Sequence, residues 1–575
     1  MEKKRLLRLP VWFILFLIVG SYLYYIHLYA VNIPISDDYD LIRVKYTLLT
    51  QEYSWLKTLQ FLIEPENDHR ILIPRTIALL DYAVEGFINY RTLIWIVNGS
   101  LLGILGIWLV SFLRKGLNIW FFIPVLLWYL NPFVFDVTLW GINGMQHTTL
   151  NLLIFASLYL LATTPRLFTL ALLLAFAATF TNGNGFLVFP AGLVLLLLAS
   201  ERKKAIGWSI GMVVALLAYF LNYSVGQATK VTVSGQFIQN LLVSFAALSG
   251  GWVAAFKGNS YVWLLWGAFT AGFITLVGVT LWLIGQTLLA SAKPRPSHAY
   301  FWTGVFLFSV MTIGIIAVSR GGRDVYSVFT SRYSLYPLHL LTLSYLALLT
   351  WKAIPQPWVF RVALGFGIVF AAMSFYQYLP DIDTRRRSLV ADHYNWRQHR
   401  KLMTHFRSEL ADFFTQPAYD KGIYRFTDFP LENAEAIISA PADTKASQKT
   451  DLKLSTRIKD IDFFNHPQKI AQFTLENTGW AQPGFGKEGV FLVLKSLKNT
   501  TYLLPTWPVQ GGKRQFFTSG KVYKKGFAVT LYNENFVPDT YQIGLLSPQD
   551  KGYALHYLSQ SVQIDSLNAQ LVNHP

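Results

Sequence analysis

The chain has 575 residues, of which 53% are hydrophobic and only 14% are charged, with a mean hydropathy of +0.36. Because about a quarter of the residues in soluble domains are charged, this composition excludes an ordinary soluble protein and indicates an integral membrane protein. The formal net charge of +17 does not indicate a nucleic-acid partner, since much of the excess lies in short loops between apolar segments. The chain has no cysteine, which excludes disulfides, thiolate chemistry and cysteine-based metal sites.

The N-terminus combines a basic start with a long apolar segment. Lys3, Lys4, Arg5 and Arg8 precede an apolar run from Leu9 to Ala30. This run is long for a signal peptide, and no cleavage site of small residues follows it. We therefore expect a retained first transmembrane helix with its N-terminus in the cytoplasm.

The next segment, residues 31–91, is expected to form a loop outside the cytoplasm. Its start reads Ile35-Ser36-Asp37-Asp38-Tyr39-Asp40, and a second polar cluster covers Glu64 to Arg70. Carboxylates at the mouth of a membrane segment are costly unless water, a cation or a substrate meets them there. The alternative is that these aspartates solvate a loop or cap a helix starting near Tyr39.

Two interfacial helices are predicted inside this loop. Leu41 to Ile63 mixes apolar and basic residues in a pattern typical of an amphipathic helix lying on the membrane. Ile71 to Ile88 is apolar but interrupted by Pro74, Arg75, Asp81 and Glu85, which indicates a second interfacial or partly embedded helix.

Further apolar runs alternate with short loops as far as Tyr376. With the first helix they make about eleven transmembrane helices by the ~20-residue criterion, several of them short. Most predicted inner loops carry Lys or Arg, as the positive-inside rule requires. Three arginines on the predicted outer side, Arg320, Arg323 and Arg332, break the rule; they either pair with loop carboxylates or bind an anion such as phosphate.

The composition changes after Tyr376. Residues 377–448 are expected to form a juxtamembrane helix and a linker, the linker lying at Ala434 to Ser447. Residues 449–575 contain short runs rich in Val, Phe, Tyr, Leu and Thr, separated by turn signals such as Gly511-Gly512. These runs predict an all-β, sandwich-like domain outside the cytoplasm. Residues 1–376 would form the transmembrane domain.

Asp37 or Asp38 could act as a base, and Arg332-Tyr333, which opens a late helix from the same side, could hold a phosphate. With these residues and the predicted topology, the chain resembles the GT-C glycosyltransferases, which include the protein O-mannosyltransferases and the lipid A aminoarabinose transferases. The resemblance implies a catalytic base at Asp37, with Asp38 as close competitor, and a donor phosphate near Arg332. The stretch that contains Glu66, Asp68, His69 and Arg70 also resembles an Asn-Glu-His-Arg stretch of some bacterial members of this superfamily. Glu66 and Asp68 are alternatives for the acidic residue of that stretch.

Other polar residues are weaker candidates for substrate binding. His147 could bind a sugar or a phosphate, although a helix-start cap or a satisfied loop residue is the preferred reading. Asn182-Gly183-Asn184-Gly185 reads as a tight turn. Arg320 and Arg323 bracket Gly321-Gly322, which is equally consistent with a phosphate-binding loop and with a structural one. Asp37, Asp38 and Asp68 could hold a divalent cation, but the resemblance implies no metal and no cofactor.

The expected function is an inverting transfer of a sugar from a polyprenyl-phosphate donor to an envelope glycan, lipid or protein, at the outer face of a bacterial cytoplasmic membrane. The expected partners are this donor, the acceptor and membrane lipids, without nucleic acid. One alternative is a transporter or flippase of lipid-linked sugar, which would favour charges at mid-membrane and internal hydropathy symmetry. A second is a non-catalytic envelope-assembly protein.

Overall fold

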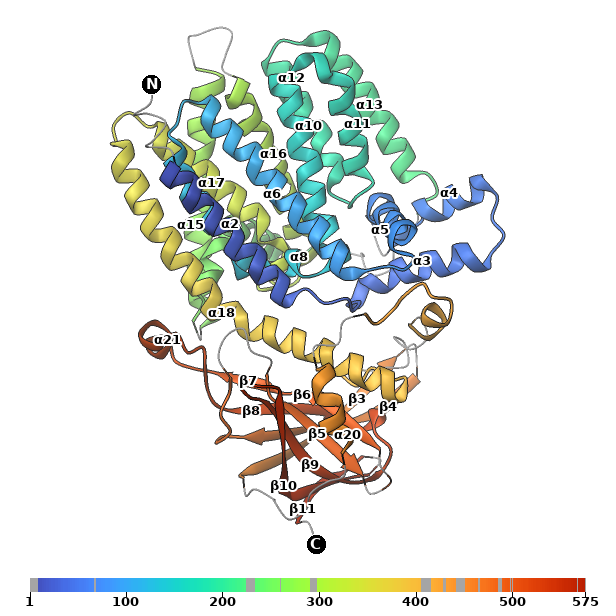
Figure 1. Cartoon of the computed structure of the whole chain (residues 1–575). Coiled ribbons are helices and arrows are strands. Elements are labelled where there is room, and N and C mark those ends of the chain that lie inside the picture. Colours follow the sequence, from blue (N-terminus) through green and yellow to red (C-terminus); the bar gives the residue numbers. More distant parts are fainter. Residues whose placement is uncertain are drawn as a thin grey trace. The chain divides into compact units, whose positions relative to one another are not determined.

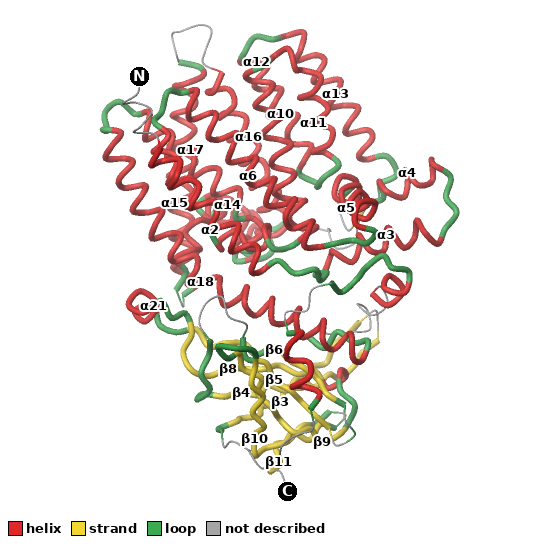
Figure 2. The backbone as a smooth tube through the Cα atoms, in the orientation of Figure 1, coloured by secondary structure: helices red, strands yellow, loops and turns green. Residues whose placement is uncertain are grey.

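The structure is a computed structural model that describes residues 9–66, 69–223, 233–258, 260–289, 297–404, 415–427, 431–440, 450–463, 466–483, 489–496, 498, 500–565 and 567–573. The chain divides into two compact units. The first comprises Met1–Ala30, Ser36–Glu85 and Tyr90–Gln377, and the second comprises Val31–Ile35, Gly86–Asn89 and Tyr378–Pro575. The first unit is helical apart from one two-stranded ribbon, and the larger sheets belong to the second (Figures 1 and 2).

The helices of the first unit follow the apolar runs of the sequence, and the last of them, Gln356–His399, continues past Gln377 into the second unit. A helix satisfies its backbone hydrogen bonds internally, which is the condition for crossing a bilayer. In chain order they are α2 (Leu9–Tyr29), α3 (Tyr39–Thr50), α4 (Trp55–Ile63), α5 (Leu72–Glu85), α6 (Tyr90–Arg114), α7 (Ile123–Tyr129), α8 (Phe135–Thr138), α9 (Gly141–Gly144), α10 (Leu150–Thr163), α11 (Phe168–Thr179), α12 (Val188–Leu198), α13 (Arg202–Phe220), α14 (Gly235–Ser249), α15 (Tyr261–Thr287), α16 (Ser297–Ile316), α17 (Leu335–Thr350) and α18 (Gln356–His399).

The number of single helices that are long enough to cross a membrane is smaller than the number predicted from the sequence. Among the described residues, seven helices are long and apolar enough, or eight if the bent pair Ile119–Tyr129 and Pro132–Thr138 is one span. The expected count of about eleven is therefore wrong, because it included the shorter apolar helices Pro165–Thr179, Gly185–Leu198 and Leu335–Thr350. Apolar composition located these helices, but helix breaks shorten them below a bilayer's thickness.

The loop between the first two spans contains three helices, which Figure 1 shows together at one end of the helical unit. We call Ser36–Glu85 the acidic loop. The single helix expected over Leu41 to Ile63 is wrong: α3 ends at Thr50, and α4 begins after Ser54, whose hydroxyl accepts a hydrogen bond from Lys57 N at 3.4 Å. The expected second helix is present as α5. Between α4 and α5, β1 (Pro65–Glu66) pairs with β2 (His69–Arg70).

The second unit contains two antiparallel sheets. One has the order β3-β4-β8-β7 and the other β11-β10-β9-β5-β6. The four predicted runs lie in β4, β5, β8 and β9, and the other five strands were not predicted. The strands are β3 (Leu452–Phe463), β4 (His466–Asn477), β5 (Phe491–Ser496), β6 (Thr501–Pro505), β7 (Trp507–Gln510), β8 (Tyr523–Tyr532), β9 (Asp539–Pro548), β10 (Tyr553–Ile564) and β11 (Ala569–Asn573).

Strand β5 is buried on both faces. Its alternate residues Leu492 and Leu494 belong to the core shared with the other sheet, which includes Phe473 and Val529. Phe491 and Val493 belong to a second core with residues of α18 and α20 (Glu435–Ser439). Side chains of a strand alternate between faces, so the five-stranded sheet is covered on both sides. The linker expected over Ala434 to Ser447 thus begins as a helix; residues 441–447 lie outside the described residues.

Two short segments that flank the acidic loop in sequence belong to the second unit. Tyr424 donates its hydroxyl hydrogen to Asn32 O at 2.7 Å, and the Asn32 amide donates to Arg425 O at 2.9 Å. On the other side of the acidic loop, Ile88 N donates to Ile423 O at 2.8 Å. The same short stretch of chain therefore holds the residues before and after the acidic loop.

Helices α14 and α15 approach each other closely at two glycines. A Cβ built on Gly272 would lie 1.8 Å from Ala246 O, and one on Gly250 would lie 2.1 Å from Ala268 O. Small residues at such a contact allow the backbones of membrane helices to approach. The α14–α15 contact is therefore set by residues that cannot carry a larger side chain.

We expect Gly272→Val to destabilise the first unit by at least about 1–3 kcal/mol, because the added side chain overlaps the α14 backbone. Gly278→Val is the matched control, since it adds the same side chain to the same helix at a position with no atom within 4 Å of the new Cβ. Thermal unfolding of the purified proteins in detergent measures the difference. Equal unfolding temperatures for both variants would contradict this description of the contact.

Candidate functional site

Three aspartates at the start of the acidic loop have three different environments. Asp37 is half-buried, Asp38 is 1% exposed and Asp40 is 5% exposed. They occupy the short helical turn Ser36–Asp38 and the first residues of α3. Asp37 is thus the most accessible of the three carboxylates, while its neighbours are committed to the interior of the first unit.

Asp38 connects the acidic loop to the start of another helix. Its Oδ1 accepts a hydrogen bond from Ile142 N at 2.8 Å, and its carbonyl oxygen accepts one from the Tyr90 hydroxyl at 2.9 Å. The sequence-based alternative that an aspartate caps α3 is half right: α3 begins at Tyr39, but Asp38 makes no side-chain bond to it. The carboxylate instead satisfies a backbone donor in the first turn of the helix that begins at Gly141.

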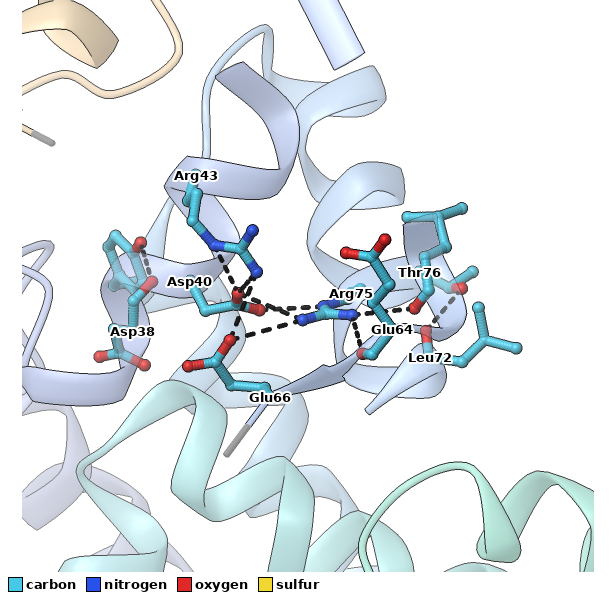
Figure 3. Close-up of polar contacts among 10 residues, drawn as sticks. Asp38, Asp40, Arg43, Glu64, Glu66, Leu72, Arg75 and Thr76 are labelled. Atoms are coloured by element: carbon cyan, nitrogen blue, oxygen red, sulfur yellow. Dashed lines mark hydrogen bonds and ion pairs between the residues drawn. The ribbon is translucent and has the colours of Figure 1, made fainter. Parts of the chain in front are cut away.

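A buried ion-pair cluster holds the three helices of the acidic loop together (Figure 3). Arg75 Nε lies 2.9 Å from Asp40 Oδ2 and Arg75 Nη2 lies 3.2 Å from Asp40 Oδ1, a two-pronged contact. Arg75 Nη1 donates to the carbonyl oxygens of Leu62 and Glu64, at 3.0 and 2.6 Å. Arg75 on α5 therefore joins the start of α3 to the end of α4.

Two further residues complete this cluster. Arg43 Nη2 lies 2.5 Å from Asp40 Oδ1. Glu66 Oε2 lies 3.3 Å from Arg43 and 3.6 Å from Arg75. We call Asp40, Arg43, Glu66 and Arg75 the charge cluster; Figure 3 shows them directed toward one another, with the Asp38 side chain to one side.

The pKa values of the two carboxyl groups in the charge cluster are shifted in opposite directions. Burial alone would raise the pKa of Asp40, but the charge and hydrogen bonds of Arg75, with the charge of Arg43, outweigh it and lower this pKa. Burial, followed by the hydrogen bond and negative charge of Asp40, raises the pKa of Glu66 to about 7. Two acids with separated pKa values are typical of sites that transfer protons, although structural ion pairs show the same pattern.

Arg70 connects the acidic loop to α13, and His69 packs against the Asn182–Gly185 turn. Arg70 donates to Tyr219 O and Leu221 O, both at 2.5 Å, and to Ile63 O at 2.7 Å. Cations are favourable at helix C-termini, so Arg70 has a structural reason to be there. The His69 ring packs on Gly183, where a Cβ would lie 2.4 Å from Nδ1. The predicted Asn182–Gly185 turn is confirmed, with Gly185 N donating to Asn182 O at 2.9 Å.

His147 lies inside a helix, so the preferred reading of it as a cap or loop residue is wrong. Residues Met145–Thr149 form a π-helical turn within the continuous span Gly141–Thr163. His147 Nδ1 lies 3.2 Å from the Tyr336 hydroxyl, to which the Asn184 amide donates at 3.1 Å. π-Helical turns are often found at functional sites, and this one gathers polar side chains from α17 and the Asn182–Gly185 turn.

Arg332 and Tyr333 belong to the same neighbourhood. The Tyr333 ring packs edge-on against His147, with ring centres 6.2 Å apart, and Arg332 and His69 lie close enough to His147 to act on it electrostatically. The Ser331 hydroxyl donates to Phe133 O at 3.1 Å. Arg332 Nε is buried, and no described residue accepts a hydrogen bond from it. A buried donor without a partner requires an explanation, and a bound anion would provide one.

The segment Phe133–His147 is therefore where the predicted residues converge. Asp38 binds its middle at Ile142, and Arg332 and His69 lie near its end at His147. Arg320 and Arg323 are exposed and lie shortly after α16. The two glycines between them pack tightly: a Cβ on Gly321 would lie 2.3 Å from Ser244, and one on Gly322 would lie 2.2 Å from Phe237. Close packing explains these glycines without a phosphate-binding loop. Asp68 lies outside the described residues.

The sequence singled out Glu66 but did not predict the charge cluster to which it belongs. The available signal was Arg75, which interrupts a largely apolar segment. A charge buried in such a segment needs a partner of opposite charge. Asp40 and Arg43 lie in the same loop as Arg75, but the sequence alone does not show which of these charged residues pair with one another.

Among the described residues, no three His, Asp or Glu side chains are grouped as a metal site would require. Comparison of the chain with protein-family models, with curated proteins and with solved structures finds no match. The geometry of the acidic loop and of the Phe133–His147 segment is therefore the basis for inferring a function.

We expect Arg75→Met to lower the free energy of unfolding by about 3–5 kcal/mol, because it leaves the buried Asp40 carboxylate without its main partner. Arg43→Gln removes a guanidinium from the same cluster, but its side chain is 33% exposed against 0% for Arg75. Its cost should stay near 1 kcal/mol or below. Denaturant unfolding in detergent measures both, and similar losses would show that burial does not determine the strength of the pair.

We expect one carboxyl group of the protein to titrate with a midpoint near 7 and to disappear in Glu66→Gln. The folded protein holds this proton more tightly than an ordinary Glu, whose pKa is 4.5. The resulting stabilisation is complete below pH 4.5 and is lost as the pH rises through about 7. Infrared difference spectroscopy of the carboxyl C=O band follows the titration. Glu64→Gln, which removes an exposed carboxylate of the same loop, should leave the band in place; its loss there would contradict the assignment to Glu66.

Proposed function

We propose that this chain is a membrane glycosyltransferase that moves a sugar from a polyprenyl-phosphate donor to an acceptor hydroxyl of the cell envelope. One observation carries the proposal: an accessible acidic turn and a buried, unpartnered guanidinium nitrogen gather on one segment, Phe133–His147, although they are about 300 residues apart in sequence. A carboxylate base and a cation for a leaving phosphate are the groups that such a transfer needs.

In the proposed reaction the Asp37 carboxylate accepts the proton of the acceptor hydroxyl. The hydroxyl oxygen attacks the anomeric carbon of the donor sugar from the face opposite the phosphate. The bond between this carbon and the phosphate oxygen breaks, and the electron pair leaves with the phosphate, which inverts the anomeric configuration. Asp38 is a positioning residue, because its Oδ1 is held by Ile142 N and it keeps the Asp37 turn in place.

Arg332 is the proposed ligand of the donor phosphate. Guanidinium binds phosphate oxygens through paired hydrogen bonds, and the Nε of Arg332 has none to a described residue. Polar groups fixed in advance at a developing charge lower the barrier without reorganising. The contacts of the neighbouring π-helical turn, from His147 to Tyr336 and Asn184, support such a fixed arrangement.

The side of the membrane is part of the proposal. Polyprenyl-phosphate sugars serve as donors outside the cytoplasm in the GT-C enzymes that the chain resembles, so the acidic loop would face outward. The basic residues of Arg202-Lys203-Lys204 begin α13, and Arg70 lies at its other end. Under the positive-inside rule the end of α13 that carries Arg202, Lys203 and Lys204 would face the cytoplasm. The second unit would then lie outside the cytoplasm as well.

We expect Asp37→Asn to reduce sugar transfer by about 100-fold or more, since loss of a general base removes that much rate. Arg332→Gln should reduce it to a similar extent. The measurement is transfer of radiolabel from a panel of polyprenyl-phosphate sugars to envelope extract by the purified full chain.

Glu52→Gln is the matched control, because it removes an exposed carboxylate of the same acidic loop, and it should retain full activity. Unfolding temperatures of all variants exclude loss of fold. Full transfer by Asp37→Asn would overturn the proposal. Movement of an intact lipid-linked sugar across liposomes, unaffected by this substitution, would replace it with the transporter alternative.

A further inference from the structure

An open groove of about 730 Å³ lies between α12 and α13, far along α13 from the acidic loop. Leu193 and Leu197 line it from α12, and Arg202, Ile206, Ile210 and Val213 line it from α13. Its volume is typical of a small-molecule site, which is roughly 300–1,000 Å³. The groove is therefore large enough for a ligand rather than for a few waters.

The lining residues form an apolar stripe with a cation at one end. On α13 they recur every three or four positions, as one face of a helix does. Ile206 is 63% exposed, Ile210 61% and Leu197 59%. Among the described residues that line the groove, Arg202, the first residue of α13, is the only charged one. An elongated ligand with an apolar chain and one anionic end would match this pattern.

The groove's length matches one leaflet of a bilayer. From Arg202 to Val213 the helix rises about 17 Å at ~1.5 Å per residue, and half of a ~30 Å hydrocarbon core is ~15 Å. Helix α13 is itself long and apolar enough to span a membrane. A lipid whose headgroup lies at Arg202 would thus place an acyl chain along the groove as far as the middle of the bilayer.

The charge at the headgroup end is positive. Arg202 and Lys203 are exposed, and Lys204 pairs with Glu201 at 3.2 Å, so the Glu201–Lys204 stretch keeps a net positive charge. Basic residues at a membrane surface attract anionic lipids. A guanidinium at the groove's end also offers directed hydrogen bonds to a phosphate.

We propose that the α12–α13 groove binds one anionic phospholipid, with its phosphate at Arg202 and Lys203 and one acyl chain along Ile206, Ile210 and Val213. The site goes beyond the proposed transfer reaction and does not depend on it. A donor lipid is not the occupant that the geometry favours, because its phosphate would belong at the other end of α13, where Arg70 of the acidic loop binds Tyr219 O. The full helix separates the two ends by about 28 Å.

The test is native mass spectrometry of the purified full chain in mixed micelles that contain equal amounts of phosphatidylglycerol and phosphatidylcholine. We expect phosphatidylglycerol to be retained in preference by about tenfold, as one bound copy. The double substitution Arg202→Gln/Lys203→Gln should remove most of this preference. Arg166→Gln is the matched control, since Arg166 is exposed in the short turn between α10 and α11 and does not line the groove.

A second pair of variants tests the groove itself. Ile210→Trp should displace the bound lipid, because the indole occupies the space of the chain. Leu217→Trp adds the same side chain at a 68% exposed position farther along α13 and should retain the lipid. Equal retention of both lipids by the native protein, no effect of the double substitution, equal effects of the two tryptophans, or a dimer that covers the groove without lipid would each overturn the proposal. Unfolding temperatures confirm that the variants fold.

Discussion

The buried ion pair between Asp40 and Arg75 is the constraint on which the candidate site depends. Burying two charges is expensive, and they persist only where geometry and further hydrogen bonds compensate for lost hydration. Arg75 meets this condition by contacting both oxygens of Asp40 and two carbonyl oxygens at the end of α4. Because these contacts join three helices, α3, α4 and α5 are held together as one unit within the acidic loop.

Once the acidic loop is held together, a second contact orients it. Asp38 accepts the amide hydrogen of Ile142, so the turn that carries Asp37 is joined to the start of the Gly141–Thr163 span. The same span carries the π-helical turn at His147, beside Arg332 and Tyr333. Groups from the beginning, the middle and the late part of the chain therefore meet on one helix, and the proposed transfer would need polar groups held in place in this way.

Three aspartates within four positions thus divide three tasks by environment alone. Asp40 is buried and paired with arginine, Asp38 is buried and bound to a backbone amide, and Asp37 stays accessible. The two ends of α13 show a similar division. Arg70 binds carbonyl oxygens at one end, while Arg202 borders an apolar groove at the other. In each case the residue type is the same and the surroundings decide what the side chain can do.

The sequence by itself determined the membrane-helix character, the amphipathic acidic loop and the β-rich C-terminal region, because hydropathy and strand patterns are local properties of the chain. It also singled out Asp37, Asp38 and Arg332, although not which acid is accessible. Tertiary structure alone decided the number of full spans, the break between α3 and α4, and the charge cluster. The pairing of Asp40 with Arg75, or of Asp38 with Ile142, joins residues 35 and 104 positions apart. Contacts at such separations follow from how helices pack, which no local pattern records.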